Sequence, residues 1–211
     1  MSGASTKART GVVRLVGAGP GDPELLTVKA AKAIAGADVI VFDRLVSNAI
    51  LDLVPPGVRR IDVGKSAGRH PVPQAALNEL LVALAQAGHE VVRLKGGDPF
   101  LFGRGGEEAL ALRAAGIPLE VIPGISSAQG CAAALGVPLT HRTLASGVRF
   151  VTGHARAGAE LALDWDGLAD PETTLVVYMG LAGIAGIAVR LIAAGRGSET
   201  PVLAVSRGTL P

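Results

Sequence analysis

The sequence has little of three things that would point to particular functions: cysteine, aromatic side chains and net charge. Cys131 is the only cysteine among 211 residues, which excludes a disulfide within the chain and a metal site built from several thiolates. Aromatic residues make up 3% of the chain, too few for a platform that stacks single-stranded nucleic acid. With 20 lysines and arginines against 18 acids, the net charge is only +2. We therefore expect neither nucleic acid nor a membrane as a partner.

The sequence also has no long apolar run. No stretch approaches the roughly 20 residues that a membrane-spanning helix needs. Residues 1–10, MSGASTKART, lack the apolar centre of a signal peptide. We expect a cytoplasmic protein whose first ten residues form a disordered tail. The apolar fraction of 49% nevertheless predicts a folded chain that buries a substantial core.

Strand and helix patterns alternate along the chain. Short apolar runs predict strands at residues 12–19, 38–43, 58–64, 90–98, 119–122, 149–154, 173–180 and 201–209. Helical spacing predicts helices at residues 27–37, 73–88, 125–136 and 181–195, and another that starts near Gly105. The alternation is typical of an α/β protein with parallel or mixed sheets. Because the sequence changes character beyond Pro138, we expect an N-terminal α/β domain over residues 11–140 and a C-terminal one over 141–211.

Two of these helices have a predicted buried face. In residues 27–37, Thr27 is a candidate N-cap. The apolar face of that helix is formed by Val28, Ala31, Ile34 and Ala35. In residues 73–88, one stripe is formed by Leu77, Leu80, Leu81 and Leu84. These faces should pack on the predicted sheet.

The segment KGGDPFLFGRGGEE, residues 95–108, concentrates glycine and charge where a predicted strand ends. Gly96 and Gly97 allow a ligand or another backbone to approach closely. Asp98 offers an acceptor, which suits a neutral or cationic ligand that carries hydroxyls, an amine or a sulfonium. The alternative is a tight strand–turn–helix connection that Asp98 caps. The residues alone leave both interpretations open.

The segment VGAGPGD, residues 16–22, invites a dinucleotide interpretation that its residues contradict. The G-x-G-x-x-G motif would need a glycine where Asp22 stands, and a carboxylate beside a pyrophosphate has the wrong sign. Pro20 also removes one amide that would hold the phosphates. We therefore expect no nicotinamide nucleotide here.

Six blocks occur along the chain: VGAGPGDPELLTVKA, VFDRLVS, VGK, LKGGDPFLFGRGGEE, VIPGISSAQGCAAALGVPLTHR and VTGH. In order and spacing they resemble the uroporphyrinogen-III C-methyltransferases of the tetrapyrrole methylase family, over nearly all of residues 12–211. The resemblance implies two α/β domains with S-adenosylmethionine in the cleft between them. It further implies transfer of two methyl groups to uroporphyrinogen III, giving precorrin-2 and S-adenosylhomocysteine. The family acts as a homodimer without a metal, in siroheme or cobalamin biosynthesis.

The resemblance also assigns candidate site residues. The implied cofactor contacts are Pro20, Gly96, Gly97, Asp98, Leu101, Ser126, Ser127, Met179 and Gly208. Asp43 matches the family's proposed proton acceptor, and Lys65 its proposed proton donor. From the residues alone, Asp43 is equally explained as a helix cap and Lys65 as a solvated lysine. Because uroporphyrinogen is a polycarboxylate, we expect cations around it, and the candidates in predicted loops are Arg44, Arg104, His141 and Arg142.

One departure from the family concerns the C-terminal domain. Family members usually continue for a few dozen residues beyond the pair Gly208–Thr209, whereas this sequence ends at Pro211. We expect the second domain to be incomplete, with a sheet edge and apolar surface uncovered. Two alternatives stay open: methylation of a different corrin-pathway tetrapyrrole, and non-catalytic binding of S-adenosylmethionine or a tetrapyrrole.

Overall fold

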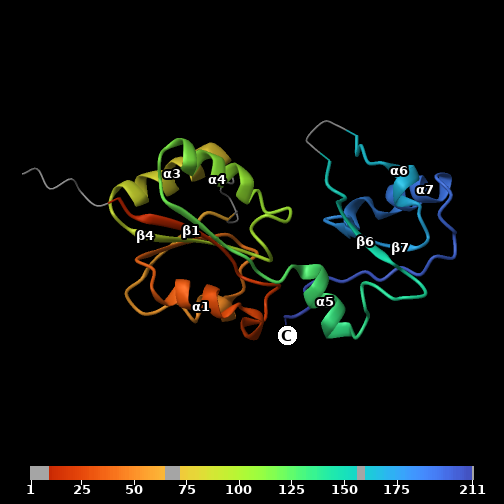
Figure 1. Cartoon of the computed structure of the whole chain (residues 1–211), viewed down its shortest axis with the longest axis horizontal. Helices are drawn as coiled ribbons and strands as arrows, with labels where there is room; N and C mark the ends of the chain where they lie inside the picture. Colours follow the sequence, from red (N-terminus) through yellow and green to blue (C-terminus); the bar gives the residue numbers. More distant parts are fainter. Residues whose placement is uncertain (1–9, 65–71, 156–159, 211) are drawn as a thin grey trace, which may run out of the picture. The chain divides into compact units, whose positions relative to one another are not determined.

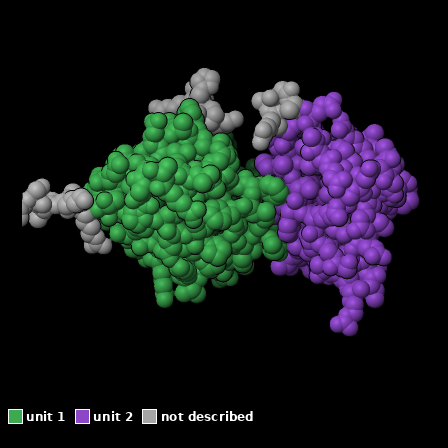
Figure 2. Space-filling model, turned by 45° about the horizontal axis from the view of Figure 1, so that its top comes forward, with its two compact units in different colours: residues 1–130, 207–211 green, residues 131–206 purple. Residues whose placement is uncertain are grey.

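The structure is a computed structural model that describes residues 10–64, 72–155 and 160–210. These residues form two compact units (Figure 2). The first unit contains the described residues up to Gly130 and the segment that starts at Arg207, and the second runs from Cys131 to Ser206. The sequence analysis placed the division at residue 140 and the C-terminal segment in the second domain. Each unit is described by itself.

The first unit is built on a five-stranded parallel sheet (Figure 1). Its strands, in the spatial order β3-β2-β4-β1-β5, are β1 (Val12–Gly17), β2 (Val39–Phe42), β3 (Arg59–Asp62), β4 (Glu90–Lys95) and β5 (Leu119–Ile122). After β1 the chain passes to β2, which lies on one side of the adjacent pair β4 and β1. After β4 it passes to β5, which lies on the other side of this pair. The direction of winding therefore reverses between the adjacent strands β1 and β4. Open α/β sheets bind ligands at the carboxyl ends of the strands at such a reversal.

Helices cover both faces of this sheet, which confirms the predicted α/β fold. Helix α1 (Val28–Ala35) lies on one face, and α3 (Gln74–Gln86) and α4 (Gly105–Ala114) lie on the other (Figure 1). The shorter elements of this unit are η1 (Pro23–Leu25) and α2 (Asn48–Leu51), and α5 (Ser127–Leu135) begins in it. Because strand side chains alternate between faces, β4 directs Val91 to the α3 side and Val92 to the α1 side.

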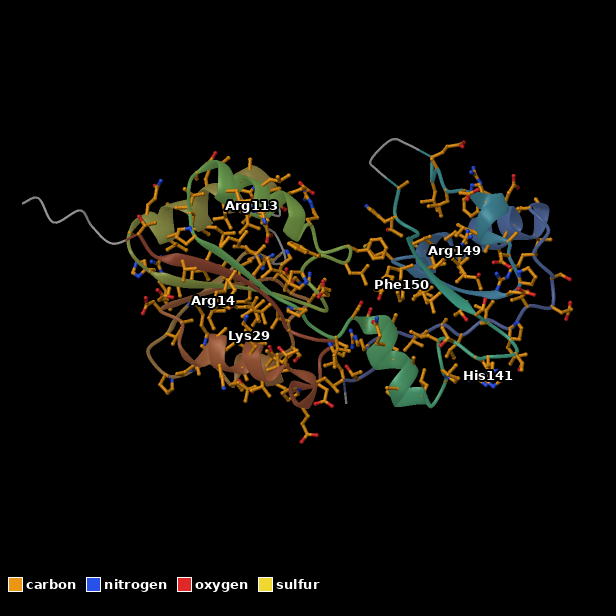
Figure 3. The ribbon with its side chains drawn as sticks, in the orientation of Figure 1. Arg14, Lys29, Arg113, His141, Arg149 and Phe150 are labelled. Carbon is orange, nitrogen blue, oxygen red and sulfur yellow. The ribbon has the colours of Figure 1, made fainter. Side chains whose placement is uncertain are left out.

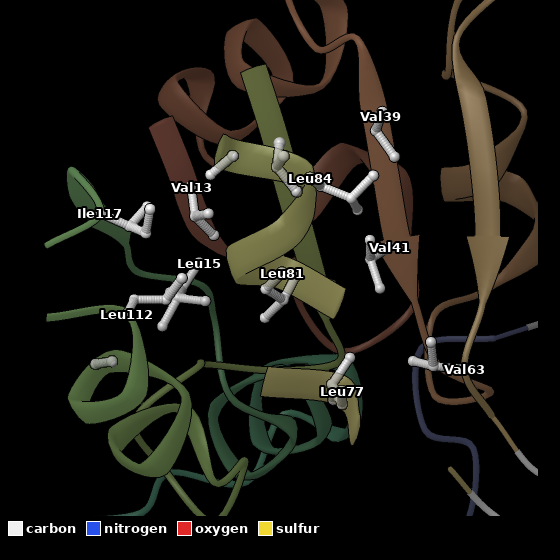
Figure 4. Packing of buried hydrophobic residues seen from close by; sticks show 13 residues of the cluster. Val13, Leu15, Val39, Val41, Val63, Leu77, Leu81, Leu84, Leu112 and Ile117 are labelled. Atoms are coloured by element: carbon white, nitrogen blue, oxygen red, sulfur yellow. The ribbon is translucent and has the colours of Figure 1, made fainter. Parts of the chain in front are cut away.

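The core under α3 follows the sequence prediction. Leu77, Leu81 and Leu84 are buried, and Leu80 packs against them while partly exposed. They contact a layer of strand and α4 side chains that includes Val13, Leu15, Val39, Val41 and Leu112 (Figure 4). The leucine stripe at helical spacing thus meets the valine-rich face of the sheet.

The buried face of α1 was predicted wrongly. Thr27 does cap the helix, because its hydroxyl accepts the Ala30 N–H at 3.1 Å. The buried residues of the helix, however, are Ala30, Ala33 and Ile34, and Val28 is 73% exposed. Alanines occur on both sides of this helix, so apolar spacing alone does not choose between the two faces. The structure places Ala30 and Ala33 against the sheet and leaves the larger Val28 exposed, so the helix can approach the sheet closely.

The second unit contains one pair of parallel strands, β6 (Gly147–Thr152) and β7 (Thr173–Tyr178). The last part of α5 belongs to this unit, which also contains α6 (Trp165–Leu168), η2 (Leu181–Gly183) and α7 (Ile184–Ala193). Phe150 and Tyr178 meet edge to face across the strand pair, with ring centroids 6.1 Å apart. Ile187 is the buried residue of α7, and Arg190 of the same helix lies over the ring of Trp165.

The strand predicted at residues 201–209 is wrong. No strand pairing involves residues 201–207, although the run PVLAV has a strand-like composition. A strand needs a neighbouring backbone to pair with, and among the described residues β6 and β7 pair with each other only. Val202 is 77% exposed, so no packing supports an extended arrangement here. Arg207, with φ of 57°, and Thr209, with φ of 150°, then break the extended conformation.

Candidate active site

Three glycines bring the loops after β1, β4 and β5 into backbone contact at the reversal of the sheet. A Cβ atom on Gly17 would lie 2.5 Å from the Gly124 nitrogen and 2.7 Å from the Gly97 oxygen. Gly97 has φ of +68°, a conformation that favours glycine. Gly19 and Gly97 also exchange two backbone hydrogen bonds, of 3.2 and 2.7 Å. We call Gly17, Gly97 and Gly124 the glycine floor.

Other segments pack around the loop that follows β1. Pro20 lies against Gly130 of α5, since a Cβ on Gly130 would be 2.5 Å from the Pro20 ring. The Ser47 hydroxyl caps α2 and donates a hydrogen bond of 2.6 Å to the Gly21 carbonyl. Leu210 also packs against Gly21, since a Cβ built there would lie 2.6 Å from a Leu210 methyl carbon. The C-terminal segment that carries Gly208 is therefore part of the first unit's carboxyl edge.

Most of the predicted cofactor residues lie in these loops. Gly96 contacts Leu45 of the loop after β2, and Ser126 is buried with its Cα 3.8 Å from a Cβ built on Gly97. Ser127 is exposed at the start of α5, and Leu101 is half-buried in the loop after Asp98. The structure thus brings together, at one edge, the residues Pro20, Gly96, Gly97, Asp98, Leu101, Ser126, Ser127 and Gly208.

The Asp98 carboxylate accepts hydrogen bonds from two loops of the site and holds them together. Its Oδ1 accepts the Phe100 N–H at 2.8 Å, and its Oδ2 accepts the Gly124 N–H at 3.1 Å. The carboxylate therefore ties the loop after β4 to the loop after β5, and it does not cap α4, whose N-cap is Arg104. Each carboxylate oxygen has a further lone pair, so bracing leaves Asp98 able to accept from a ligand.

The connection from Asp98 to α4 has unusual backbone geometry. Phe102 and Arg104 have φ of 54° and 58°, and such left-handed conformations cost about 1–2 kcal/mol each for a side chain with a Cβ. The Gly105 N–H donates to the Pro99 carbonyl at 3.0 Å and closes the turn. Arg104 pairs with Glu107 through two bonds of 2.8 and 2.7 Å, which raises the pKa of Arg104 and lowers the pKa of Glu107. Strain of this kind is concentrated at functional sites.

Four charged side chains, three of them buried, form a network beside the glycine floor. Arg93 Nη2 lies 2.9 Å from Asp43 Oδ2, and Arg93 Nε lies 3.3 Å from Glu108 Oε1. Lys95 Nζ lies 3.0 Å from the same Glu108 oxygen. Burial lowers the pKa of Lys95, and the positive charge of Arg93 adds to this, although Glu108 acts in the opposite direction. We call Asp43, Arg93, Lys95 and Glu108 the charge network.

Sequence reasoning found only Asp43 of this network. The signal it missed is that Arg93 and Lys95 alternate in a strand that is otherwise apolar. Charges in a central strand are rare unless they are paired, so their presence predicts a partner. That partner is Glu108, in the first turn of α4.

The remaining predicted residues are exposed or belong to the second unit. Arg44 is exposed and packs against Gly64. In the second unit His141 and Arg142 are exposed, and Met179, which follows β7, is 58% exposed with φ of 58°. Lys65 lies outside the described residues.

Two further features concern metal binding and membrane spanning. No three or more His, Cys, Asp or Glu side chains lie where they could hold a metal ion, within the parts of the chain that the structure describes. Over the same residues, no helix combines the length and the apolar character needed to cross a membrane.

Comparison with known proteins identifies the family. Residues 12–211 match the sequence profile of the tetrapyrrole (corrin/porphyrin) methylases. The chain belongs to the tetrapyrrole methylase family. It is 57% identical to the uroporphyrinogen-III C-methyltransferase of Paracoccus denitrificans over 205 residues, which cover 97% of this chain and 71% of that protein. It is 55% identical over 202 residues to the chloroplastic S-adenosyl-L-methionine-dependent uroporphyrinogen III methyltransferase of Arabidopsis thaliana, covering 95% of this chain and 55% of the relative.

Other relatives of this tetrapyrrole methylase are longer or more distant. It is 54% identical to the siroheme synthase of Acinetobacter baylyi over 97% of its own length, but it covers only 44% of that protein. Among solved structures, the uroporphyrin-III C-methyltransferase of Thermus thermophilus complexed with S-adenosylhomocysteine has a TM-score of 0.74 at 44% identity, covering 89% of this chain and 74% of that one. A cobalt precorrin-4 methyltransferase has a TM-score of 0.82 at 29% identity, covering 94% and 81%.

Proposed function

We propose that this tetrapyrrole methylase transfers two methyl groups from S-adenosylmethionine to uroporphyrinogen III, giving precorrin-2 and S-adenosylhomocysteine in siroheme biosynthesis. The observation that carries the proposal is the glycine floor, since eight of the nine cofactor residues implied by the resemblance lie in the segments around it at the reversal of the sheet. The names of relatives more than half identical to the chain support this substrate. The S-adenosylhomocysteine named with the Thermus structure supports this cofactor.

The glycine floor suits a sulfonium donor. Backbone carbonyls and amides can approach the methionine and ribose portions closely where no side chain intervenes, and Asp98 adds a negative acceptor. S-adenosylmethionine is already activated, so the protein's task is to align donor and acceptor for an in-line displacement. The substrate carbon forms a bond to the methyl group while the carbon–sulfur bond breaks, and sulfur leaves as a neutral thioether.

Asp43 is the proposed base. The methylated ring is cationic and becomes neutral by losing a proton, which a carboxylate within reach can accept. Asp43 follows β2 at the same edge as the glycine floor, and its side chain is 26% exposed while the rest of the charge network is buried. Lys65 remains the proposed proton donor.

The polycarboxylate substrate calls for cations around it. The exposed Arg44 and Arg104 are the candidates in the first unit, and His141 and Arg142 those in the second. Met179 is proposed to pack on the adenine ring, and Gly208 to contact the cofactor. A homodimer in the cytoplasm, serving siroheme or cobalamin formation, completes the proposal.

A second candidate is methylation of another corrin-pathway tetrapyrrole, which the TM-score of 0.82 to a cobalt precorrin-4 methyltransferase favours. Incubation of the chain with S-adenosylmethionine and uroporphyrinogen III under anaerobic conditions separates the two. We expect a product that carries two added methyl groups by mass, and two S-adenosylhomocysteine molecules for each product. Turnover of a different tetrapyrrole only would favour the second candidate, and cofactor binding without turnover of any tetrapyrrole would favour a binding protein.

A further inference from the structure

The central strand β4 carries two charges that nothing in the proposed chemistry yet uses. Arg93 and Lys95 are 3% and 4% exposed, and Glu108 beside them is fully buried. Removing such charges from water is expensive, so a buried set persists only when its members satisfy one another. With Asp43 included, the charge network holds two positive and two negative groups and is neutral.

We propose that Arg93 is a positioning residue that fixes the carboxylate of Asp43 for proton removal, with Glu108 as its anchor. This inference rests on the proposed function, in which Asp43 is the base. Arg93 reaches Asp43 from inside the sheet, whereas substrate would reach the same carboxylate from its exposed side. Arg93 therefore acts through Asp43 and has no contact with substrate.

The guanidinium of Arg93 is held on several sides at once. Its Nε donates to Glu108 Oε1, and its Nη1 donates to the Leu94 carbonyl at 2.9 Å and the Val41 carbonyl at 3.5 Å. Nη2 is then left to donate to Asp43 Oδ2 at 2.9 Å. A guanidinium is planar and rigid, so fixing its other nitrogens fixes the direction of this one.

Glu108 is itself locked in place. Its Oε1 accepts from Arg93, from Lys95 at 3.0 Å and from Gln74 Nε2 at 3.4 Å, while its Oε2 is buried without a hydrogen-bond partner among the described residues. Three donors on one oxygen hold the carboxylate in a single orientation. The anchor thus draws on β4, α3 and the first turn of α4.

The fixed guanidinium of Arg93 in turn fixes the orientation of the Asp43 carboxylate. Its Oδ1 accepts the Leu45 N–H at 3.1 Å, and its Oδ2 accepts from Arg93, so both oxygens have fixed directions. Proton removal from the methylated ring needs a base held at hydrogen-bond distance and angle. Without Arg93 the Asp43 side chain keeps, among the described residues, only the local bond to Leu45 and gains freedom to rotate.

The test is the variant Arg93→Met in the full chain, which leaves the Lys95–Glu108 pair intact and Asp43 free to be hydrated. We expect kcat to fall at least tenfold, while the dissociation constant for S-adenosylmethionine does not increase, because the one excess negative charge left in the network does not repel the positive sulfur. Arg93→Lys keeps the charge and should recover part of the lost kcat. The matched control is Arg14→Met. Arg14 lies on β1 (Figure 3) and also makes two ion pairs, to Glu90 and Glu120.

A double-variant cycle separates positioning from a merely structural role. If Arg93 acts through Asp43, Arg93→Met has no further effect on kcat when Asp43→Asn is already present. Equal reductions in both backgrounds, or the same loss of kcat in Arg14→Met, would overturn the positioning role while the proposed function stands. A wild-type chain that methylates no tetrapyrrole would overturn the proposed function and the positioning role together.

Discussion

The glycine floor makes a sharp prediction about a single methyl group. In Gly17→Ala the new Cβ would meet the Gly124 nitrogen at 2.5 Å, the Gly124 Cα at 2.6 Å and the Gly97 oxygen at 2.7 Å. All three are backbone atoms, so no side chain can rotate away and the loops must separate. Overpacking of this kind costs about 1–3 kcal/mol of unfolding free energy.

The same strain should weaken cofactor binding. If S-adenosylmethionine needs the loops at their native separation, binding must reverse the shift, and a cost of about 1–3 kcal/mol corresponds to roughly a 5- to 150-fold weaker dissociation constant. Urea denaturation measures the first effect, and isothermal titration with S-adenosylmethionine measures the second.

Gly106→Ala is the matched control for Gly17→Ala. Gly106 lies in the glycine-rich segment that also carries Gly97, in the first turn of α4, and a Cβ there meets nothing within 4 Å. Replacing a helical glycine by alanine stabilises by about 0.5–1 kcal/mol, so this variant should be at least as stable as the wild type and bind the cofactor equally well. If Gly17→Ala bound S-adenosylmethionine as tightly as Gly106→Ala, the glycine floor would not be the cofactor site.

Two further predictions concern neighbouring side chains. Asp98→Ala removes the acceptors for the Phe100 and Gly124 amides and should lower the unfolding free energy by about 2 kcal/mol and cofactor affinity by more than tenfold in calorimetry; unchanged affinity would remove Asp98 from the site. Burial lowers the pKa of Lys95 below 10.5, so between the lowered pKa and 10.5 the unfolded chain binds more protons, and the contribution of Lys95 to stability rises with pH. Denaturation at several pH values should show that the unfolding free energy of the wild type rises relative to that of Lys95→Met as the pH approaches 10.5. A difference between the two unfolding free energies that stays constant with pH would contradict this.

Much of the first unit could be predicted from local patterns. Glycines after apolar runs marked the ends of β1 and β4, and because parallel strands end at one edge of a sheet, the structure brings Gly17 and Gly97 together there. The leucine stripe of α3 pointed to its buried face because Leu77, Leu81 and Leu84 recur at helical spacing. Where the local pattern is unambiguous, it agrees with the structure.

The failures have a common physical origin in contacts between distant residues. The strand expected at residues 201–209 needed a partner strand, which no local pattern reports. In α1, apolar residues occupy both the face with Val28 and the face with Ala30, and packing chose the one with Ala30. The charge network depends on α4 crossing β4 so that Glu108 meets Arg93, and this meeting is invisible in the sequence.

Because the charge network is neutral, a change in its charge should alter the binding of the methyl donor, S-adenosylmethionine. S-adenosylmethionine carries a positive sulfur and S-adenosylhomocysteine a neutral one, so an uncompensated charge nearby changes their relative affinity. Glu108→Gln would leave the network with one excess positive charge. Two unit charges about 10 Å apart, at an effective dielectric constant of about 20, repel by about 1.7 kcal/mol, which is more than tenfold in binding.

We therefore expect Glu108→Gln to weaken S-adenosylmethionine about tenfold more than S-adenosylhomocysteine. The difference should shrink as the pH rises, because the lowered pKa of Lys95 lets this buried amine lose its proton and the excess charge with it. Glu107→Gln is the control, because it makes the same charge change one residue away. Glu107 is exposed and pairs with Arg104, so solvent and salt screen its charge. The ratio of the dissociation constants of S-adenosylmethionine and S-adenosylhomocysteine should therefore stay unchanged. Equal weakening of both ligands by Glu108→Gln at every pH would show that Glu108 only supports the fold and that its charge does not reach the cofactor.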